Sequence, residues 1–193
     1  EYSIASLEEL LVEMQQQQAA HAVLYRYSTD PGAAIAQDEM QRLVGVGLFY
    51  LPELTIRQVT FEALKSSGQL AAIRSPALVS RLQSLSSEVA TALSLQSDES
   101  EVTYLFSDPL LIANFDMAGV FRRPRADGTK QPIPWLQGGR PTPPAPAVMK
   151  SLPFGNVVLY RSFFTGARIA SIRRVLDQHR QIAELIDARQ REL

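Results

Sequence analysis

Two histidines, His21 and His179, are the residues of this sequence most suited to acid-base or metal chemistry. Each stands on the apolar face of a helical pattern, so the two could meet across a helical bundle. A metal site in such a bundle needs carboxylates beside the histidines, as in the Glu-x-x-His pattern. The nearest match places Gln18 three residues before His21, with an amide where the metal needs a carboxylate. We therefore predict no metal site and interpret both histidines as core residues, or alternatively as groups that orient a ligand.

Other catalytic patterns are missing from the sequence. The absence of cysteine excludes thiol nucleophiles and thiolate metal sites. No Walker A motif, Gly-x-Ser-x-Gly elbow or Ser-x-x-Lys motif occurs. Gly45-Val46-Gly47 begins like a dinucleotide fingerprint, but Tyr50 stands where the third glycine is needed. We predict no catalytic residue and no cofactor, and we do not expect an enzyme.

Charged residues cluster at two places in the sequence. An acidic cluster, whose spacing does not fit a calcium-binding loop, is interpreted as a solvated face; it comprises Asp98, Glu99, Glu101, Asp108 and Asp116. Helical pairing, such as Arg173 with Asp177, explains most arginines near the C-terminus. Among them, Arg161 is our candidate, with the two histidines, for orienting an anionic ligand.

The composition is that of a globular domain with a core of its own. The 193 residues are 46% hydrophobic and carry a formal net charge of -1. A balanced charge does not indicate a nucleic-acid partner. We predict one domain over residues 1–193.

Hydrophobic spacing and capping residues predict helices along most of the chain. Helices are expected from the Ser6-x-x-Glu9 capping box to the Asp30-Pro31-Gly32 turn, and over residues 33–44, 55–68, from Ser75 onward and 154–193. The second-last helix either pauses at residues 97–100 or continues, and Asp108-Pro109 could open a new one. Residues 44–51 are the only candidate strand. The fold class we expect is all-α, an antiparallel bundle with two long helices and a long Pro-rich basic loop.

The Pro-rich loop, residues 122–153, interrupts the helical pattern. It holds eight of the twelve prolines, and its six basic residues and one acidic residue give a net charge of +5. Such a loop is either a solvated connection or a functional segment. Because tryptophan and arginine are common at binding hot spots, we select a candidate partner surface within it; this surface comprises Trp135, Arg122, Arg123, Arg125 and Arg140.

Residues 61–78, FEALKSSGQLAAIRSPAL, resemble a segment of an uncharacterised family of bacterial membrane-anchored proteins. The matching positions include Phe61, Gly68 and Ser75, and the stretch from Asn156 to Asp187 is also similar to that family. The resemblance implies a helical extracytoplasmic domain that follows a transmembrane anchor, here upstream of Glu1. It implies no chemistry, because the activity of the family is not established.

From the resemblance and the loop together we expect an extracytoplasmic interaction or sensory domain in the bacterial cell envelope, on the periplasmic side of the inner membrane. Its partner would be a protein or another envelope component, with a second copy of the chain as an alternative and no nucleic acid. The rival hypothesis is a helical bundle that binds a small anionic molecule.

Overall fold

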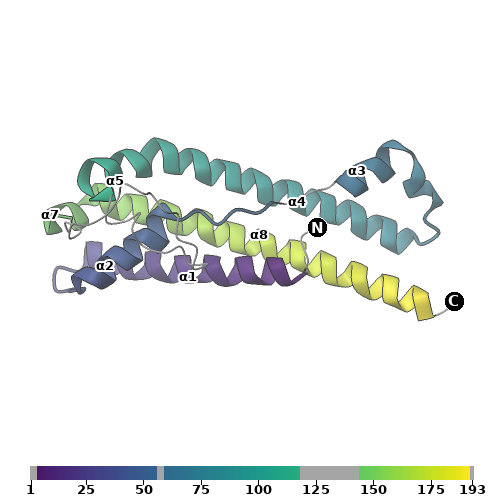
Figure 1. Ribbon diagram of the computed structural model, residues 1–193, viewed down its shortest axis with the longest axis horizontal. Coiled ribbons are helices and arrows are strands. Elements are labelled where there is room, and N and C mark those ends of the chain that lie inside the picture. Colours follow the sequence, from purple (N-terminus) through teal and green to yellow (C-terminus); the bar gives the residue numbers. More distant parts are fainter. Residues whose placement is uncertain (1–3, 56–58, 118–143, 192–193) are drawn as a thin grey trace, which may run out of the picture. The chain divides into compact units, whose positions relative to one another are not determined.

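The computed structural model describes residues 4–55, 59–117 and 144–191, and over these residues the chain is helical or irregular, without strands (Figure 1). This confirms the expected all-α class. The elements are α1 (Ile4–Thr29), α2 (Gln37–Val44), η1 (Gly45–Phe49), α3 (Val59–Ser66), η2 (Gln69–Ala72), α4 (Pro76–Val102), η3 (Thr103–Ser107), α5 (Asp108–Asn114), α7 (Pro146–Met149) and α8 (Leu152–Arg191). The two long helices expected are α4 and α8, and α1, with 26 residues, is nearly as long as α4 with its 27.

The chain divides into two compact units, each built from separate stretches of sequence. Unit 1 comprises residues 1–12, 53–97 and 167–193, and unit 2 comprises residues 13–52 and 98–166. Helices α1, α4 and α8 each contribute residues to both units. That the chain is a single domain stays a prediction.

In unit 1 the helices run antiparallel, as expected for a bundle. On α8, Arg168 donates to Gln96 of α4 over 2.9 Å, and Arg174 donates to Glu88 over 2.8 Å. The residue number rises along α8 while that of the partner on α4 falls, so the two helices are antiparallel. The buried apolar side chains of this unit come from α1, α4, α8 and the segment before α3; they are Leu7, Leu10, Leu11, Leu54, Val89, Ala92, Ile169, Ile172, Val175, Leu176 and Ile182.

In unit 2 the same antiparallel direction relates α8 to α1. A Cβ built on Gly155 of α8 would lie 3.2 Å from the Ser28 hydroxyl, and one on Gly166 would lie 3.1 Å from Gln18 Nε2. The two helices therefore approach closely at these glycines. An apolar cluster fills the space between α1, α2, η1, α5, α7 and α8; it comprises Ala20, Leu24, Met40, Leu43, Val44, Leu48, Leu111, Phe115, Met149, Phe154, Val157 and Val158.

Several predicted boundaries hold and one does not. The Leu78 amide donates to the Ser75 hydroxyl over 3.3 Å, so Ser75 caps α4 as expected. Gly68, with φ of +73°, follows the end of α3, since glycine adopts this left-handed conformation without strain. Ser6 lies inside α1, so the capping box predicted there is wrong. The Asp108-Pro109 pair does open α5, but without a side-chain cap.

The predicted Pro-rich loop is too long at its C-terminal end. Pro146 stands in the first turn of α7, and Leu152 and Pro153 begin α8. Proline is compatible with a first helical turn because the amide it lacks would have no partner there. Lys150, counted among the loop cations, donates to the backbone carbonyls of Asp30 and Pro31, over 3.2 and 2.7 Å.

The candidate strand at residues 44–51 is also wrong, because Val44 ends α2 and residues 45–49 form the π-helical segment η1. The Tyr50 amide donates to the Gly45 carbonyl over 3.1 Å, the five-residue spacing of a π-helix. A second π-helical segment, η3, joins α4 to α5. Residues 97–100, where a pause was one alternative, continue α4 without a break. π-Helical turns often occur at functional positions in helices.

Candidate functional site

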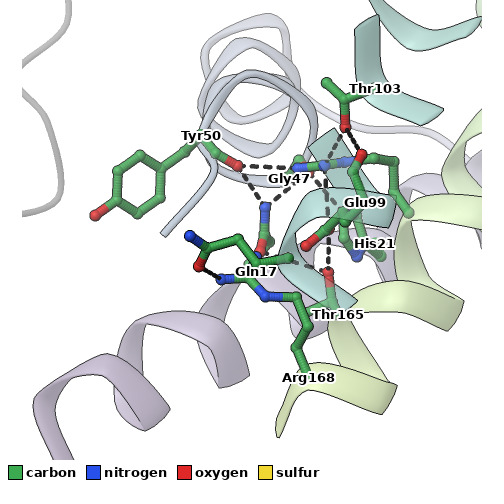
Figure 2. Close-up of polar contacts among 10 residues, drawn as sticks. Gln17, His21, Gly47, Tyr50, Glu99, Thr103, Thr165 and Arg168 are labelled. Carbon is green, nitrogen blue, oxygen red and sulfur yellow. Dashed lines mark hydrogen bonds and ion pairs between the residues drawn. The ribbon is translucent and has the colours of Figure 1, made fainter. Parts of the chain in front are cut away.

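A buried layer of polar side chains lies in unit 2, beside both π-helical segments (Figure 2). It is made of three pairs, and the two residues of each pair are four positions apart in the sequence. One pair lies on α1, one spans the end of α4 and the start of η3, and one lies on α8. Residues four apart share one face of a helix, so each pair points the same way. We call this set the polar layer; it comprises Gln17, His21, Glu99, Thr103, Arg161 and Thr165. All of its side chains except Thr103 belong to residues that are fully buried.

An ion pair forms the centre of the polar layer. Arg161 Nη1 lies 3.0 Å from Glu99 Oε1, and both side chains have no exposed surface. Arg161 also donates to the Thr103 hydroxyl over 2.5 Å and to the Tyr50 carbonyl over 3.0 Å. Such pairing is required, because an isolated buried charge is strongly unfavourable. The positive charge of Arg161 is therefore compensated within the chain.

Hydroxyl groups extend the ion pair to its neighbours. The Thr103 hydroxyl donates to the Glu99 backbone carbonyl over 2.8 Å. The Thr165 hydroxyl is 3.3 Å from Glu99 Oε1 and 3.5 Å from Gln17 Oε1, and its single hydrogen serves one of them at a time. Through these contacts η3 and α1 are tied to the same ion pair.

The segment η1 meets the polar layer through backbone carbonyls. Gln17 Nε2 donates to the Tyr50 carbonyl over 2.5 Å and to the Gly47 carbonyl over 3.3 Å. Figure 2 shows the Tyr50 ring turned away from the layer, and its hydroxyl donates to Glu13 over 2.9 Å. Carbonyls at the end of a π-helical turn thus find donors in side chains of α1 and α8 in place of helix amides.

His21 is held as a neutral donor. Its Nε2 lies 2.6 Å from the Gly47 carbonyl, which can only accept, so Nε2 carries the proton and Nδ1 does not. Nδ1 has no hydrogen-bond partner. Burial lowers the pKa of His21 to about 4; the Gly47 hydrogen bond opposes this, and the charge of Arg161 adds to it.

Gly47 is what lets η1 approach His21. A Cβ built on Gly47 would lie 3.2 Å from His21 Cδ2 and 3.3 Å from Leu24 Cδ1, closer than most real Cβ contacts. At Gly45 such a Cβ would meet nothing within 4 Å. The Gly-x-Gly sequence that resembled the start of a nucleotide fingerprint therefore serves helix packing at its second glycine.

The outer side of η3 is apolar. Tyr104, Leu105 and Phe106 are 75%, 52% and 63% exposed, while Thr103 before them contacts Arg161 and Ser107 after them is buried. We call these three residues the η3 triplet. Ile112 of α5 is exposed to 63% as well. Between Val102 and Asn114 the only charged residue is Asp108, whose pKa is raised by burial and lowered to a smaller degree by Arg161. A charge-poor surface with this many aromatic atoms is typical of an interface.

The predicted ligand-orienting residues fall in both units. Arg161 and His21 both belong to the polar layer of unit 2. His179 belongs to unit 1, where burial lowers its pKa and its Nε2 has no hydrogen-bond partner. The predicted partner surface of Trp135, Arg122, Arg123, Arg125 and Arg140 lies outside the described residues.

Four members of the polar layer escaped sequence reasoning. Glu99 was assigned to a solvated acidic face and is fully buried. Gln17, within the run of glutamines at residues 15–18, is buried too, and nothing in the sequence singles out Thr103 or Thr165. Outside the layer, Arg168 of α8 is buried in unit 1, where it donates to Gln96. A signal did exist, since Arg161, Thr165 and Arg168 follow the helical period.

Comparison with known proteins adds no relative. No family model matches the chain, and neither a curated protein nor a solved structure does. Within residues 4–55, 59–117 and 144–191, no group of three or more His, Asp or Glu side chains could hold a metal ion. In the same ranges, no helix combines the length and the apolar character that a membrane span requires.

Proposed function

We propose that this chain is a non-catalytic interaction domain that binds a protein partner through the η3 triplet of unit 2. The observation that carries this proposal is the exposure of three consecutive large apolar residues, Tyr104, Leu105 and Phe106, in a segment almost without charge. The exposed face of an amphipathic helix normally holds polar residues, and these three are apolar. Aromatic side chains of this kind supply most of the binding energy at protein interfaces.

The polar layer supports this role from the inside. Arg161 and Glu99 hold Thr103, the first residue of η3, through the contacts described above. A segment fixed at its base loses less conformational entropy when it binds, and this favours affinity. In this proposal the ion pair shapes the binding surface and does not itself contact the partner.

The rival hypothesis, binding of a small anionic molecule, has less support. An anion at Arg161 would compete with Glu99, which already lies 3.0 Å from the guanidinium. It would also need donors other than the Arg161 contacts to Thr103 and Tyr50. Displacing a buried carboxylate from its arginine leaves an uncompensated charge in the core.

We propose that the protein is located on the extracytoplasmic side of a bacterial inner membrane. Its function there would be to sense an envelope partner. The support is the resemblance of residues 61–78 and of the stretch from Asn156 to Asp187 to membrane-anchored proteins. Fractionation of the whole protein in its host tests this address. Recovery in the membrane fraction, with the domain cleaved by protease added outside the inner membrane, is the expected result; recovery in the cytosol would contradict it.

Site-specific photocrosslinking tests the interaction itself. A photoreactive phenylalanine analogue replaces Phe106 in one variant and Thr91, exposed on α4 in unit 1, in the control variant. We expect a discrete protein adduct in host cells from position 106 and none from position 91. The adduct should disappear when Tyr104→Ser is added. Equal yields at the two positions, or no adduct at 106, would refute the proposal.

A further inference from the structure

A second exposed apolar surface lies in unit 2, on the outer side of the first three turns of α8. Leu152, Leu159, Tyr160 and Phe163 are 76%, 50%, 57% and 68% exposed. They belong to a different helix from the η3 triplet, so an argument built on them does not depend on the function proposed above.

The exposed residues of this stretch follow a heptad. Steps of four, three and four connect Leu152, Asn156, Leu159 and Phe163, which places them at positions d, a, d and a. The other exposed residues between 152 and 163, Pro153 and Tyr160, fall at position e. The opposite position, f, is held by Phe154 and Arg161, both fully buried. The helix therefore presents one face to its own unit and a coiled-coil seam outward. We call Leu152, Asn156, Leu159 and Phe163 the α8 seam.

The α8 seam carries no charge. From Ser151 to Ala167 the only charged residue is Arg161, which is buried and paired with Glu99. Solvated helix faces normally hold Lys, Arg, Asp and Glu, as the later part of α8 does. Two identical uncharged faces can meet without the repulsion that like charges would impose.

Asn156 indicates which partner the seam fits. A single asparagine at an a position selects two-stranded pairing in one register, because its amide can both donate to and accept from the same amide of a second helix. A lipid surface offers no matching side-chain amide to Asn156. Membrane-surface helices also carry Lys or Arg to attract anionic headgroups, and this face has none.

We infer that the α8 seam is a homotypic interface, through which two copies of this chain pair by a short coiled coil. Its size sets the strength of the dimer. Aromatic side chains contribute roughly 150–250 Å² when fully buried, so the apolar seam residues together with Tyr160 expose about 400 Å² per copy. That is about half of the ~800 Å² per partner of a standard interface, so we expect a weak and reversible dimer. We expect its dissociation constant to lie in the micromolar range.

Sedimentation equilibrium of the 193-residue chain, from roughly 5 to 500 µM to span the micromolar range, tests the inference. We expect the mean mass to rise from 21.4 kDa toward twice that value. The double variant Leu159→Glu, Phe163→Glu should stay monomeric. The matched control Leu93→Glu replaces an exposed leucine of α4 in unit 1 and should dimerise like the wild type.

A second variant keeps the test valid if the charged double variant folds poorly. Asn156→Leu should strengthen association at least tenfold or produce larger oligomers, because it removes the residue that restricts the seam to two strands. A chain that stays monomeric at the highest concentration would overturn the inference. So would a dimer that none of these seam variants alters. Binding of the monomeric wild type to phosphatidylglycerol vesicles, lost in the charged variant, would also overturn it and assign the face to lipid.

Discussion

Units 1 and 2 differ in where their long-range ion pairs and their large aromatic side chains lie. In unit 1 the ion pairs Arg180–Glu8 and Arg174–Glu88 lie at the surface, and the exposed residues are mostly polar. In unit 2 the Arg161–Glu99 pair is inside, while large aromatic residues of η3 and α8 lie outside. Burying charge and exposing apolar surface both reduce stability. In our proposal this arrangement of unit 2 serves binding, whereas the two ion pairs of unit 1 are solvated surface pairs.

The difference also shows how one helix can serve two environments. From Leu152 to Gly166, α8 carries a single charged residue, directed inward; from Ala167 to Arg191 it carries many, most of them exposed. The composition of its two parts changes where the helix passes from unit 2 to unit 1. Four predictions test this contrast.

The largest effect is expected from breaking the buried ion pair. Arg161→Met removes the ion-pair partner of the fully buried Glu99, and this should reduce the free energy of unfolding by about 3–5 kcal/mol. The matched change in unit 1, Arg180→Met, removes a half-exposed pair with Glu8 and should cost about 0.2–1 kcal/mol. Urea unfolding of both variants measures the two values. Similar losses for the two variants would remove the contrast between the units.

Acidification should destabilise the fold through His21. Its pKa is about 4 in the folded chain against 6.5 in the unfolded chain, so the unfolded state binds the proton first. The stabilisation of the folded state by neutral His21 is fully present above pH 6.5. It is lost as the pH falls toward 4, and the free energy of unfolding decreases by about 3 kcal/mol in total. His21→Gln keeps a donor for the Gly47 carbonyl but cannot titrate. In this variant the free energy of unfolding should depend less on pH over this range. An unchanged pH profile in that variant would show that His21 is not buried and neutral.

A smaller effect is expected where η1 approaches α1. Gly47→Ala forces a methyl group against His21 and Leu24 and should cost about 1 kcal/mol, the low end for overpacking. Gly45→Ala, two residues earlier in the same segment, has free space and should stabilise by up to about 1 kcal/mol. Thermal melting of the pair measures the difference. Equal melting temperatures would mean that the close approach does not exist.

The smallest effect on stability is expected at the surface. Replacing Tyr104 and Phe106 together by serine should change the unfolding free energy by no more than about 0.5 kcal/mol, because both side chains are largely exposed. An adduct formed by the photoreactive analogue placed at position 105 should nevertheless be lost in this double variant. A large loss of stability would show instead that these residues pack inside the protein.

Sequence reasoning gave the helical class, the cap at Ser75, the turn at Gly68 and the long last helix, because each depends on neighbouring residues. It failed at Val44–Leu51, where a π-helical turn has no local signature distinct from a short strand. It also failed at Glu99 and Gln17, since burial of a polar side chain depends on partners far away in the sequence. Glu99 meets Arg161 across 62 positions, a separation that spacing rules cannot bridge.

A double-mutant cycle on Glu99 and Arg161 tests most directly the claim that unit 2 is organised around an internal ion pair. Urea unfolding is measured for the wild type, Glu99→Gln, Arg161→Met and the double variant, with Glu8→Gln and Arg180→Met as the matched exposed cycle. We expect the buried double variant to be more stable than Arg161→Met alone, with a coupling energy of about 2–3 kcal/mol, against less than about 0.5 kcal/mol for the exposed pair. Coupling energies of the same small size in both cycles would contradict the account.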